Sequence, residues 1–202
     1  MKQIDFGRFR STSVEKSPIN NMPLLNNTII RLRAPEPEDL DKLYDWENNA
    51  SLWELGSTRS PYSRYLLKQY IADSENDIYN HKQLRLIIEL KETNTAVGTI
   101  DLYDFDPHHH RAGVGILIDA AHQRKGFAKN ALQLLIDYAF SFLNLHQLYA
   151  HIPVTNTPSL CLFAQCGFKT TGILKDWLFS PNGYVDVVFA TKTAAADLQS
   201  VP

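Results

Sequence analysis

The chain has 202 residues, with 20 basic against 22 acidic side chains and a formal charge of −2 at neutral pH, a balance that argues against a dedicated nucleic-acid-binding protein. Two cysteines argue against a disulfide framework, and no stretch approaches the roughly 18 apolar residues of a membrane-spanning helix. The N-terminal stretch lacks the continuous apolar core of a secretory signal, so we expect a cytoplasmic protein that does not bind a membrane.

The chain divides into one domain and two short ends. Residues 1–27 are polar, with Ser, Asn and Pro, and we expect a flexible or loosely docked arm. Residues 28–195 alternate between strand-like and helix-like patterns and are expected to form a single domain. Residues 196–202 are expected to be a C-terminal tail.

The first half predicts one strand, two helices and then three strands. Residues 28–33 alternate and are β-branched, which is typical of a strand. The prolines and acids of residues 35–39 favour the start of a helix that continues to about residue 47. Ser60 before Pro61 predicts the start of a second helix, which runs to about residue 72. Strands are then expected at residues 83–90, 95–105 and 111–118.

The second half predicts two helices and three strands. Residues 127–142 carry apolar side chains at helical spacing, and residues 156–166 predict a short helix that Gly167 ends. Strands are expected at residues 146–152, 168–179 and 184–193, the last two joined by an Asn-Gly turn. This order predicts an α/β (α+β) fold in which a mixed sheet of about seven strands has helices on both faces.

The stretch ILIDAAHQRKGFA, residues 116–128, carries the most chemical information. A strand ends at Asp119, and a short loop leads into a long helix. Unpaired N–H groups at a helix start attract anions, Arg124 and Lys125 add positive charge, and Gly126 lets a phosphate approach the backbone. The pattern predicts an oligophosphate cradle, although the P-loop pattern GxxxxGK[ST] is absent. The alternative is an ordinary helix start with solvated basic residues.

Two spaced motifs resemble the GNAT family of N-acetyltransferases. Q-x-x-G-x-A at residues 123–128 is similar to the family's pyrophosphate loop, and N-x-x-S…F-x-x-C-G-F at residues 156–168 is similar to its second signature. RLRAPEPEDL and GTIDLYDFDPHHHRAGVGILID resemble its first strand and helix and its central strands. The resemblance covers about residues 28–195 and is strongest to the branch of spermidine and ribosomal-protein N-acetyltransferases.

The resemblance implies a GNAT fold with splayed central strands and direct acetyl transfer from acetyl-CoA, as co-substrate, to a primary amine in a ternary complex. The amine would be a protein N-terminus or a small amine such as a polyamine. The implied cofactor-binding residues fall into three groups: backbone groups for the pantetheine and acetyl carbonyl, a pyrophosphate loop, and residues beside the pantetheine arm. They are Ile116, Leu117 and Ile118; Gln123, Arg124, Lys125, Gly126, Phe127 and Ala128; and Asn156, Ser159 and Phe163.

The sequence departs from the family pattern at two catalytic positions. Phe163 stands where the family usually has the Tyr that protonates the thiolate, and Gly113 stands where spermidine enzymes commonly have a Glu. We therefore consider Asp101, His110 and Tyr184 as substitute catalytic residues; further polar side chains in the same region are Tyr103, His109, Asp176, Trp177 and Asp186. Two alternatives remain open: a degenerate acetyl-CoA-binding sensor or interaction module, and a nucleotide-binding protein that uses the same helix start.

Other features bear on ligands and partners. His108, His109 and His110 do not predict a metal site, because adjacent strand residues point to opposite faces, and we expect no metal. Acidic side chains that would suit a cationic acceptor are equally explained as surface charges; they are Glu47, Glu54, Asp101, Asp104 and Asp106. Three aromatic residues are explained either as core or as an acceptor pocket: Tyr44, Trp46 and Trp53. The sequence leaves a homo-oligomer open.

Overall fold

The structure, a computed structural model, describes residues 24–53, 60–72 and 77–194. Most of the predicted arm and the whole predicted tail lie outside the described residues. Residues 24–27 turn back onto the first strand, because Leu32 N donates to Leu25 O at 2.7 Å and Asn26 forms a bridge with Arg31.

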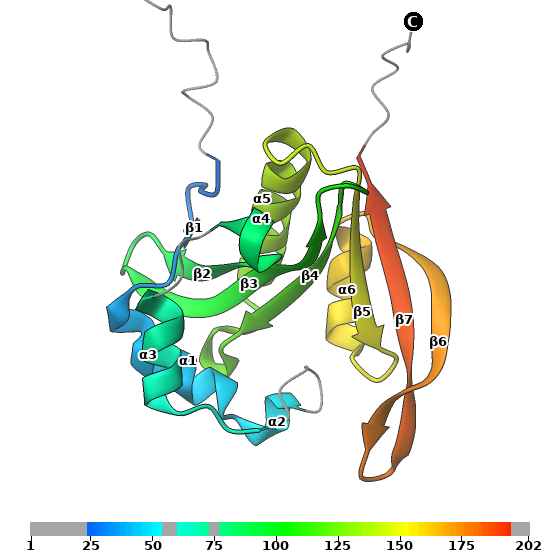
Figure 1. Ribbon diagram of the computed structural model, residues 1–202, viewed down its shortest axis with the longest axis horizontal. Helices are drawn as coiled ribbons and strands as arrows, with labels where there is room; N and C mark the ends of the chain where they lie inside the picture. The colour runs from blue at the N-terminus through cyan, green and yellow to red at the C-terminus, as the bar shows by residue number, and fades with distance from the viewer. Residues whose placement is uncertain (1–23, 54–59, 73–76, 195–202) are drawn as a thin grey trace, which may run out of the picture.

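Seven strands form one sheet in the order β1-β2-β3-β4-β5-β7-β6 (Figure 1). β4 and β5 run parallel, and every other neighbouring pair is antiparallel. The predicted mixed sheet is therefore confirmed. The strands are β1 Ile30–Arg33, β2 Leu84–Leu90, β3 Thr95–Asp106, β4 Arg111–Ile118, β5 Gln147–Pro153, β6 Lys169–Ser180 and β7 Gly183–Thr193.

Helices cover both faces of the sheet, as the sequence predicts (Figure 1). On one face, α1 and α3 bury Leu43, Trp46 and Leu67 against the strand residue Ile87. On the other face, α5 and α6 join a larger core that contains most of the buried strand residues. The helices are α1 Leu40–Glu47, α2 Ala50–Trp53, α3 Arg64–Ala72, α4 Ile78–His81, α5 Phe127–Ser141 and α6 Thr157–Gln165, with short 3-10 turns η2 Pro37–Asp39 and η3 Ala120–His122.

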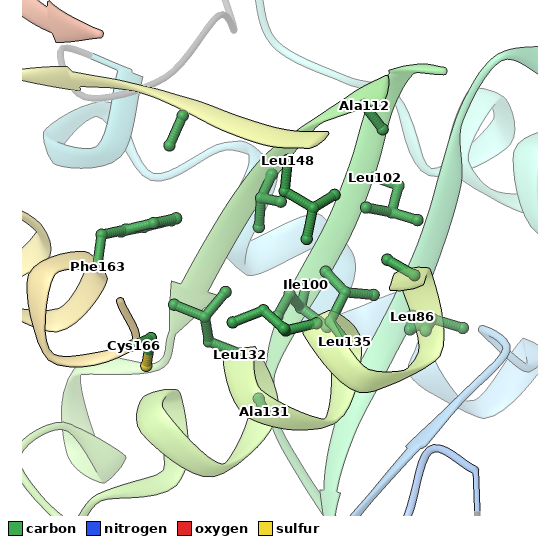
Figure 2. Packing of buried hydrophobic residues seen from close by; sticks show 14 of the residues in the cluster. Leu86, Ile100, Leu102, Ala112, Ala131, Leu132, Leu135, Leu148, Phe163 and Cys166 are labelled. Atoms are coloured by element: carbon green, nitrogen blue, oxygen red, sulfur yellow. The ribbon is translucent and has the colours of Figure 1, made fainter. Parts of the chain in front are cut away.

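The larger core explains why α5 is amphipathic. Leu132 and Leu135 of α5 are fully buried and pack with Ile100 of β3 and Leu148 of β5 (Figure 2). Each such side chain contributes about 1.5–3 kcal/mol to folding through the area it removes from water. This packing holds α5 firmly against the centre of the sheet, so the start of α5 has a fixed position relative to the end of β4.

Two features of the helices differ from the prediction. The second helix begins at Arg64, not at Pro61, because the Ser63 hydroxyl accepts a hydrogen bond from Leu66 N at 3.1 Å and so caps the helix start. The short helices α2 and α4 were not predicted, since four residues are too few to show a helical period.

The parallel strands β4 and β5 pair only over a short length. Their register joins Arg111 with Gln147 at one end and Gly113 with Tyr149 at the other, which is three residues of each strand. Beyond Gly113 the two strands diverge, as Figure 1 shows between the dark green and olive strands. The expected splay of the central strands is therefore present. Residues 114–118 pair with β3 on one side and have no strand partner on the side of β5.

Candidate active site

The diverging part of β4 leaves backbone groups without a strand partner. Asp119 N donates to Val97 O of β3 at 2.9 Å, so alternate residues of β4 direct their N–H and C=O groups toward β3. By this alternation Leu117 faces β3, whereas Ile116 and Ile118 direct their backbone groups toward the splay. Of the three residues that the sequence proposed for this role, two have the required orientation.

The loop after β4 holds itself in place with local hydrogen bonds. Gln123 Nε2 donates to Ile118 O at 3.1 Å, and Lys125 Nζ donates to Ala121 O at 3.0 Å. Arg124 is exposed and has a positive φ of 61°. Arg124 and Lys125 thus directly precede the N-cap of α5 in the chain.

The first turn of α5 fits a phosphate group. Gly126 is the N-cap with φ 82°, and no described side chain caps the helix. A Cβ atom built on Gly126 meets nothing within 4 Å, so the space above this backbone is open. Phe127 and Ala128 begin the helix and, with Lys129, direct unpaired N–H groups out of its first turn. The site therefore offers backbone donors and a helix dipole to an anion.

Asp119 anchors the start of this loop. Its carboxylate accepts from Trp46 Nε1 at 3.0 Å and from Ala121 N at 2.9 Å, and Lys42 Nζ lies 3.7 Å away. The Trp46 hydrogen bond is the largest of the influences that hold the pKa of Asp119 below its ordinary value. Trp46 is thus both a core residue and a link from α1 to the loop between β4 and α5.

The second signature lies at and after the start of α6. Asn156 caps this helix, because its Oδ1 accepts from Ser159 N at 3.2 Å. Phe163 is only 3% exposed, and its ring packs edge-to-face on Phe168 with centroids 4.9 Å apart. Figure 2 shows Phe163 projecting from α6 toward the sheet. Burial raises the pKa of the nearby Cys166 thiol, which favours a packing role for that cysteine.

Asp101 belongs to an ion-pair network on the α1 face of the sheet. Arg85 of β2 donates to Asp101 Oδ1 at 2.6 Å and to Glu47 Oε1 of α1 at 2.5 Å. The Arg85 guanidinium also lies 5.8 Å from the centre of the Tyr70 ring. Burial raises the pKa of the Asp101 carboxyl, and the charge of Arg85 acts in the opposite direction. Asp101 as a base would therefore have to act while it holds Arg85.

The other two proposed catalytic residues lie away from the splay. His110 precedes β4, where its Nδ1 faces Asn144 O at 3.2 Å, and β4 separates it from the phosphate loop by about 25 Å. Tyr184 is 65% exposed on the β6–β7 hairpin, beyond the last residue of β7 that pairs with β5. Its ring packs on Phe179 with centroids 5.7 Å apart. The structure therefore does not bring Asp101, His110 and Tyr184 together.

A cluster of ring side chains instead lies at the point where the strands diverge. The hydroxyl of Tyr103, from β3, lies 3.3 Å from Nδ1 of His151, from β5. Tyr149 stands edge-on to Tyr103 at 5.9 Å between centroids, and Phe189 of β7 lies 5.1 Å from the His151 ring. We call Tyr103, Tyr149, His151 and Phe189 the ring cluster.

Tyr149 and His151 were not among the site residues predicted from the sequence. The available signal was alternation along β5, because Tyr149 and His151 alternate with the buried residues Leu148, Ala150 and Ile152. Burial raises the pKa of Tyr149 to about 12 and also raises that of Tyr103. Partial desolvation of the His151 ring lowers its pKa, so its imidazole is neutral at pH 7.

The remaining acidic and histidine residues have local partners or lie elsewhere. Asp106 accepts from the N–H groups of His108 and His109 and pairs with Arg111, while Glu54 lies outside the described residues. Among the residues that the structure places, no three His, Cys, Asp or Glu side chains gather as a metal site would require. No helix in the described ranges is long and apolar enough to cross a bilayer.

Comparisons with known proteins agree with this geometry. The model of the acetyltransferase (GNAT) domain matches residues 30–169. Spermidine N(1)-acetyltransferase of Vibrio cholerae is 30% identical over 80% of this chain and 91% of its own. A crystal structure of the Vibrio cholerae spermidine N-acetyltransferase with CoA and spermine is 29% identical, covers 83% of this chain and 96% of that one, and has a TM-score of 0.73.

A ribosomal-protein-S5-alanine acetyltransferase from Vibrio fischeri shares the fold, with a TM-score of 0.71 at 22% identity over 83% of this chain and 94% of that one. The expected resemblance to the family, and to its spermidine branch, is confirmed. The chain therefore belongs to the GNAT family of N-acetyltransferases.

Proposed function

We propose that this protein transfers the acetyl group of acetyl-CoA directly to a primary amine, with both substrates bound at once. The observation that supports this most is the divergence of β4 from β5 beside the uncapped start of α5. The first feature presents the backbone groups of Ile116 and Ile118, and the second presents those of Gly126 and the residues after it. The two features together suit a long ligand with an apolar arm and a pyrophosphate.

Each group of residues has a distinct role in this proposal. The N–H groups at the start of α5, with Arg124 and Lys125, would hold the pyrophosphate. The backbone of Ile116 and Ile118 would bind the pantetheine arm, and an N–H on this edge would stabilise the oxyanion that forms when the amine attacks the thioester. Asn156 would face the arm with its Nδ2, since its Oδ1 already caps α6.

The acceptor is proposed to be a small amine such as a polyamine, or a protein N-terminus. The spermidine acetyltransferase relatives favour the polyamine. Gly113 provides no carboxylate to bind a cationic amine, so this chain would recognise its acceptor in another way, with the ring cluster beside that position of β4. The cytoplasmic location stays a prediction, and so does a homo-oligomer. The exposed rings of Trp177, Phe179 and Tyr184 on the β6–β7 hairpin would suit contact with a second copy of the chain.

The second candidate is an acetyl-CoA-binding protein without turnover. It is favoured by Phe163, which has no proton to donate at the position of the family's usual acid. An experiment that measures binding and transfer on the same sample separates the two.

The test is a melting-temperature measurement with acetyl-CoA, followed by thiol release over spermidine, spermine and N-terminal peptides. A ligand that binds only the native state raises the melting temperature, and ATP in place of acetyl-CoA tests the nucleotide alternative. A blank without amine corrects for the exposed thiol of Cys161. We expect stabilisation by acetyl-CoA and thiol release with one class of amine.

A charge reversal gives the matched control. Arg124→Glu should weaken acetyl-CoA binding about tenfold, because it places a negative charge beside the helix start. Lys68→Glu makes the same change of charge on an exposed position of α3 and should leave the binding as it is. Stabilisation without thiol release would support the binding-only candidate, and no stabilisation at saturating acetyl-CoA would contradict both.

A further inference from the structure

The Tyr103–His151 hydrogen bond spans the strand that carries the splay. Tyr103 belongs to β3 and His151 to β5, while β4 lies between them. The bond is possible only because β4 has glycine beneath it: a Cβ atom on Gly113 would lie 2.3 Å from two ring carbons of Tyr103. On Gly115, a Cβ atom would lie 4.0 Å from the same ring. Tyr103 and His151 therefore meet over the face of β4 on which Gly113 and Gly115 provide no side chain.

This position coincides with the end of the β4–β5 pairing. Gly113 is the last residue of β4 that pairs with β5, and its partner is Tyr149 of the ring cluster. Tyr103 pairs with Gly113 from the other side. Tyr103 and His151 thus meet at the apex of the splay, on the same strand, β4, that carries the free backbone groups of Ile116 and Ile118.

The reaction needs a proton acceptor that the sequence pattern does not provide. An amine acceptor reaches the enzyme as an ammonium ion, which must lose a proton before its nitrogen can attack a thioester. Phe163 and Gly113 replace the usual ionisable residues, and Asp101 is engaged with Arg85. The ring cluster supplies a phenol, an imidazole and an exposed route to water, because His151 is exposed.

We propose that Tyr103 and His151 form the proton relay of this enzyme, an inference that rests on the proposed acetyl transfer. The ammonium N–H bond breaks as the proton joins Tyr103 Oη, and the Tyr103 proton passes to His151 Nδ1, which becomes an imidazolium. The amine nitrogen then forms its bond to the carbonyl carbon, the carbon–sulfur bond breaks, and the second proton of the nitrogen passes to the leaving thiolate, so that a neutral amide and a thiol result. The imidazolium returns its proton to water.

The surroundings of His151 suit this role. Desolvation lowers its pKa, so the imidazole is neutral and able to accept a proton at pH 7. The described ionisable groups around it are Tyr103, Tyr149 and Asp104. The negative charge of Asp104 favours the imidazolium once it forms. β7 contributes the apolar ring of Phe189. The half-buried phenol of Tyr103, whose pKa desolvation raises, stays protonated, as a relay between the amine and the imidazole requires.

The test is the pH dependence of kcat in four proteins: the wild type, Tyr103→Phe, His151→Asn and the control His81→Gln. Tyr103→Phe removes only the hydroxyl. Asn at position 151 keeps an acceptor near the place of Nδ1 but does not titrate between pH 5 and 9. His81 is an exposed residue of α4, so its change should leave kcat unaltered.

The wild type is expected to lose kcat as the pH falls through a midpoint below 6.5, because protonation then removes the free imidazole. Both cluster variants should lower kcat at pH 7 about a hundredfold, and His151→Asn should abolish the acidic limb. The KM for acetyl-CoA should change little, since neither residue belongs to the phosphate loop.

Two results would overturn the inference in different ways. An active wild type whose acidic limb persists in both cluster variants would exclude the relay and leave the proposed acetyl transfer intact. An absence of thiol release by the wild type with every amine, although acetyl-CoA binds, would overturn the proposed transfer and the relay with it. Circular dichroism of each variant separates loss of catalysis from loss of fold.

Discussion

The ring of Tyr103 lies directly on Gly113, so closely that a Cβ atom there would be 2.3 Å from two ring carbons. The glycine is therefore a requirement of packing at the apex of the splay. Its lack of a side chain leaves room for an aromatic ring from the neighbouring strand.

The first prediction concerns this contact. Gly113→Ala should displace the Tyr103 ring, break its hydrogen bond to His151 and cost about 1–3 kcal/mol of stability through overpacking. Gly115→Ala is the matched control, because its nearest neighbour would be Asp101 Oδ2 at 3.7 Å, an ordinary contact. Urea unfolding of both variants measures the difference. Equal stabilities would mean that Tyr103 is free to move away from β4.

A second prediction concerns the helix start. Gly126→Ala should cost about 1 kcal/mol, because φ 82° is strained for a residue with a Cβ atom, and it should weaken acetyl-CoA binding by crowding the phosphate site. Gly172→Ala also enters open space but without a positive φ, so it should be nearly neutral for both properties. Thermal unfolding and calorimetric titration test the pair. Unchanged binding in Gly126→Ala would contradict the assigned cradle.

A third prediction follows from the lowered pKa of Asp119. The folded state holds this pKa below its unfolded value, so the ionised Asp119 carboxylate stabilises the fold. This contribution to the free energy of unfolding is present above about pH 4 and is lost as the pH falls through the folded pKa. Trp46→Phe removes the N–H that Asp119 accepts. Its destabilisation should therefore be larger at pH 7 than at pH 3, by about 1 kcal/mol. In an Asp119→Asn background, the destabilisation caused by Trp46→Phe should be the same at pH 7 and pH 3. If it still differs between the two pH values there, a group other than Asp119 causes the pH dependence.

A fourth prediction concerns the partly buried ion-pair network of Arg85, Asp101 and Glu47. Arg85→Met keeps the unbranched apolar stem of the side chain but leaves the carboxylates of Asp101 and Glu47 without their shared guanidinium. This should cost about 3–5 kcal/mol at pH 7. The triple variant with Asp101→Asn and Glu47→Gln should recover much of that loss. A triple variant as unstable as Arg85→Met would show that packing, and not charge, dominates at this position.

Local patterns in the sequence were sufficient for most of the fold. The alternation in residues 28–33 and the helical spacing in residues 127–142 predicted β1 and α5 to within two residues at each end. They predict well because each element buries one face, and burial imposes its period on the sequence. The start of α3 was misplaced because Ser60-Pro61 and Ser63 are both acceptable caps, and local chemistry does not rank them.

The site could be predicted only in part, for a related reason. The proposed phosphate loop is a continuous segment, so its pattern is visible in the sequence between Gln123 and Ala128. The Tyr103–His151 pair joins residues 48 positions apart across an intervening strand. The sheet order decides that meeting, and no local pattern encodes it. The ion pair between Asp101 and Arg85 could not be predicted for the same reason, since the two residues lie on different strands.

The measurement that tests this account most directly is amide hydrogen exchange, followed by NMR, with and without acetyl-CoA. The account predicts slower exchange at Ile116, Ile118 and residues 126–129, because these N–H groups gain ligand partners, and unchanged exchange at the tip of the β6–β7 hairpin. Unchanged exchange at both β4 and the start of α5, at saturating acetyl-CoA, would contradict the assignment of the splay and the helix start as the acetyl-CoA site.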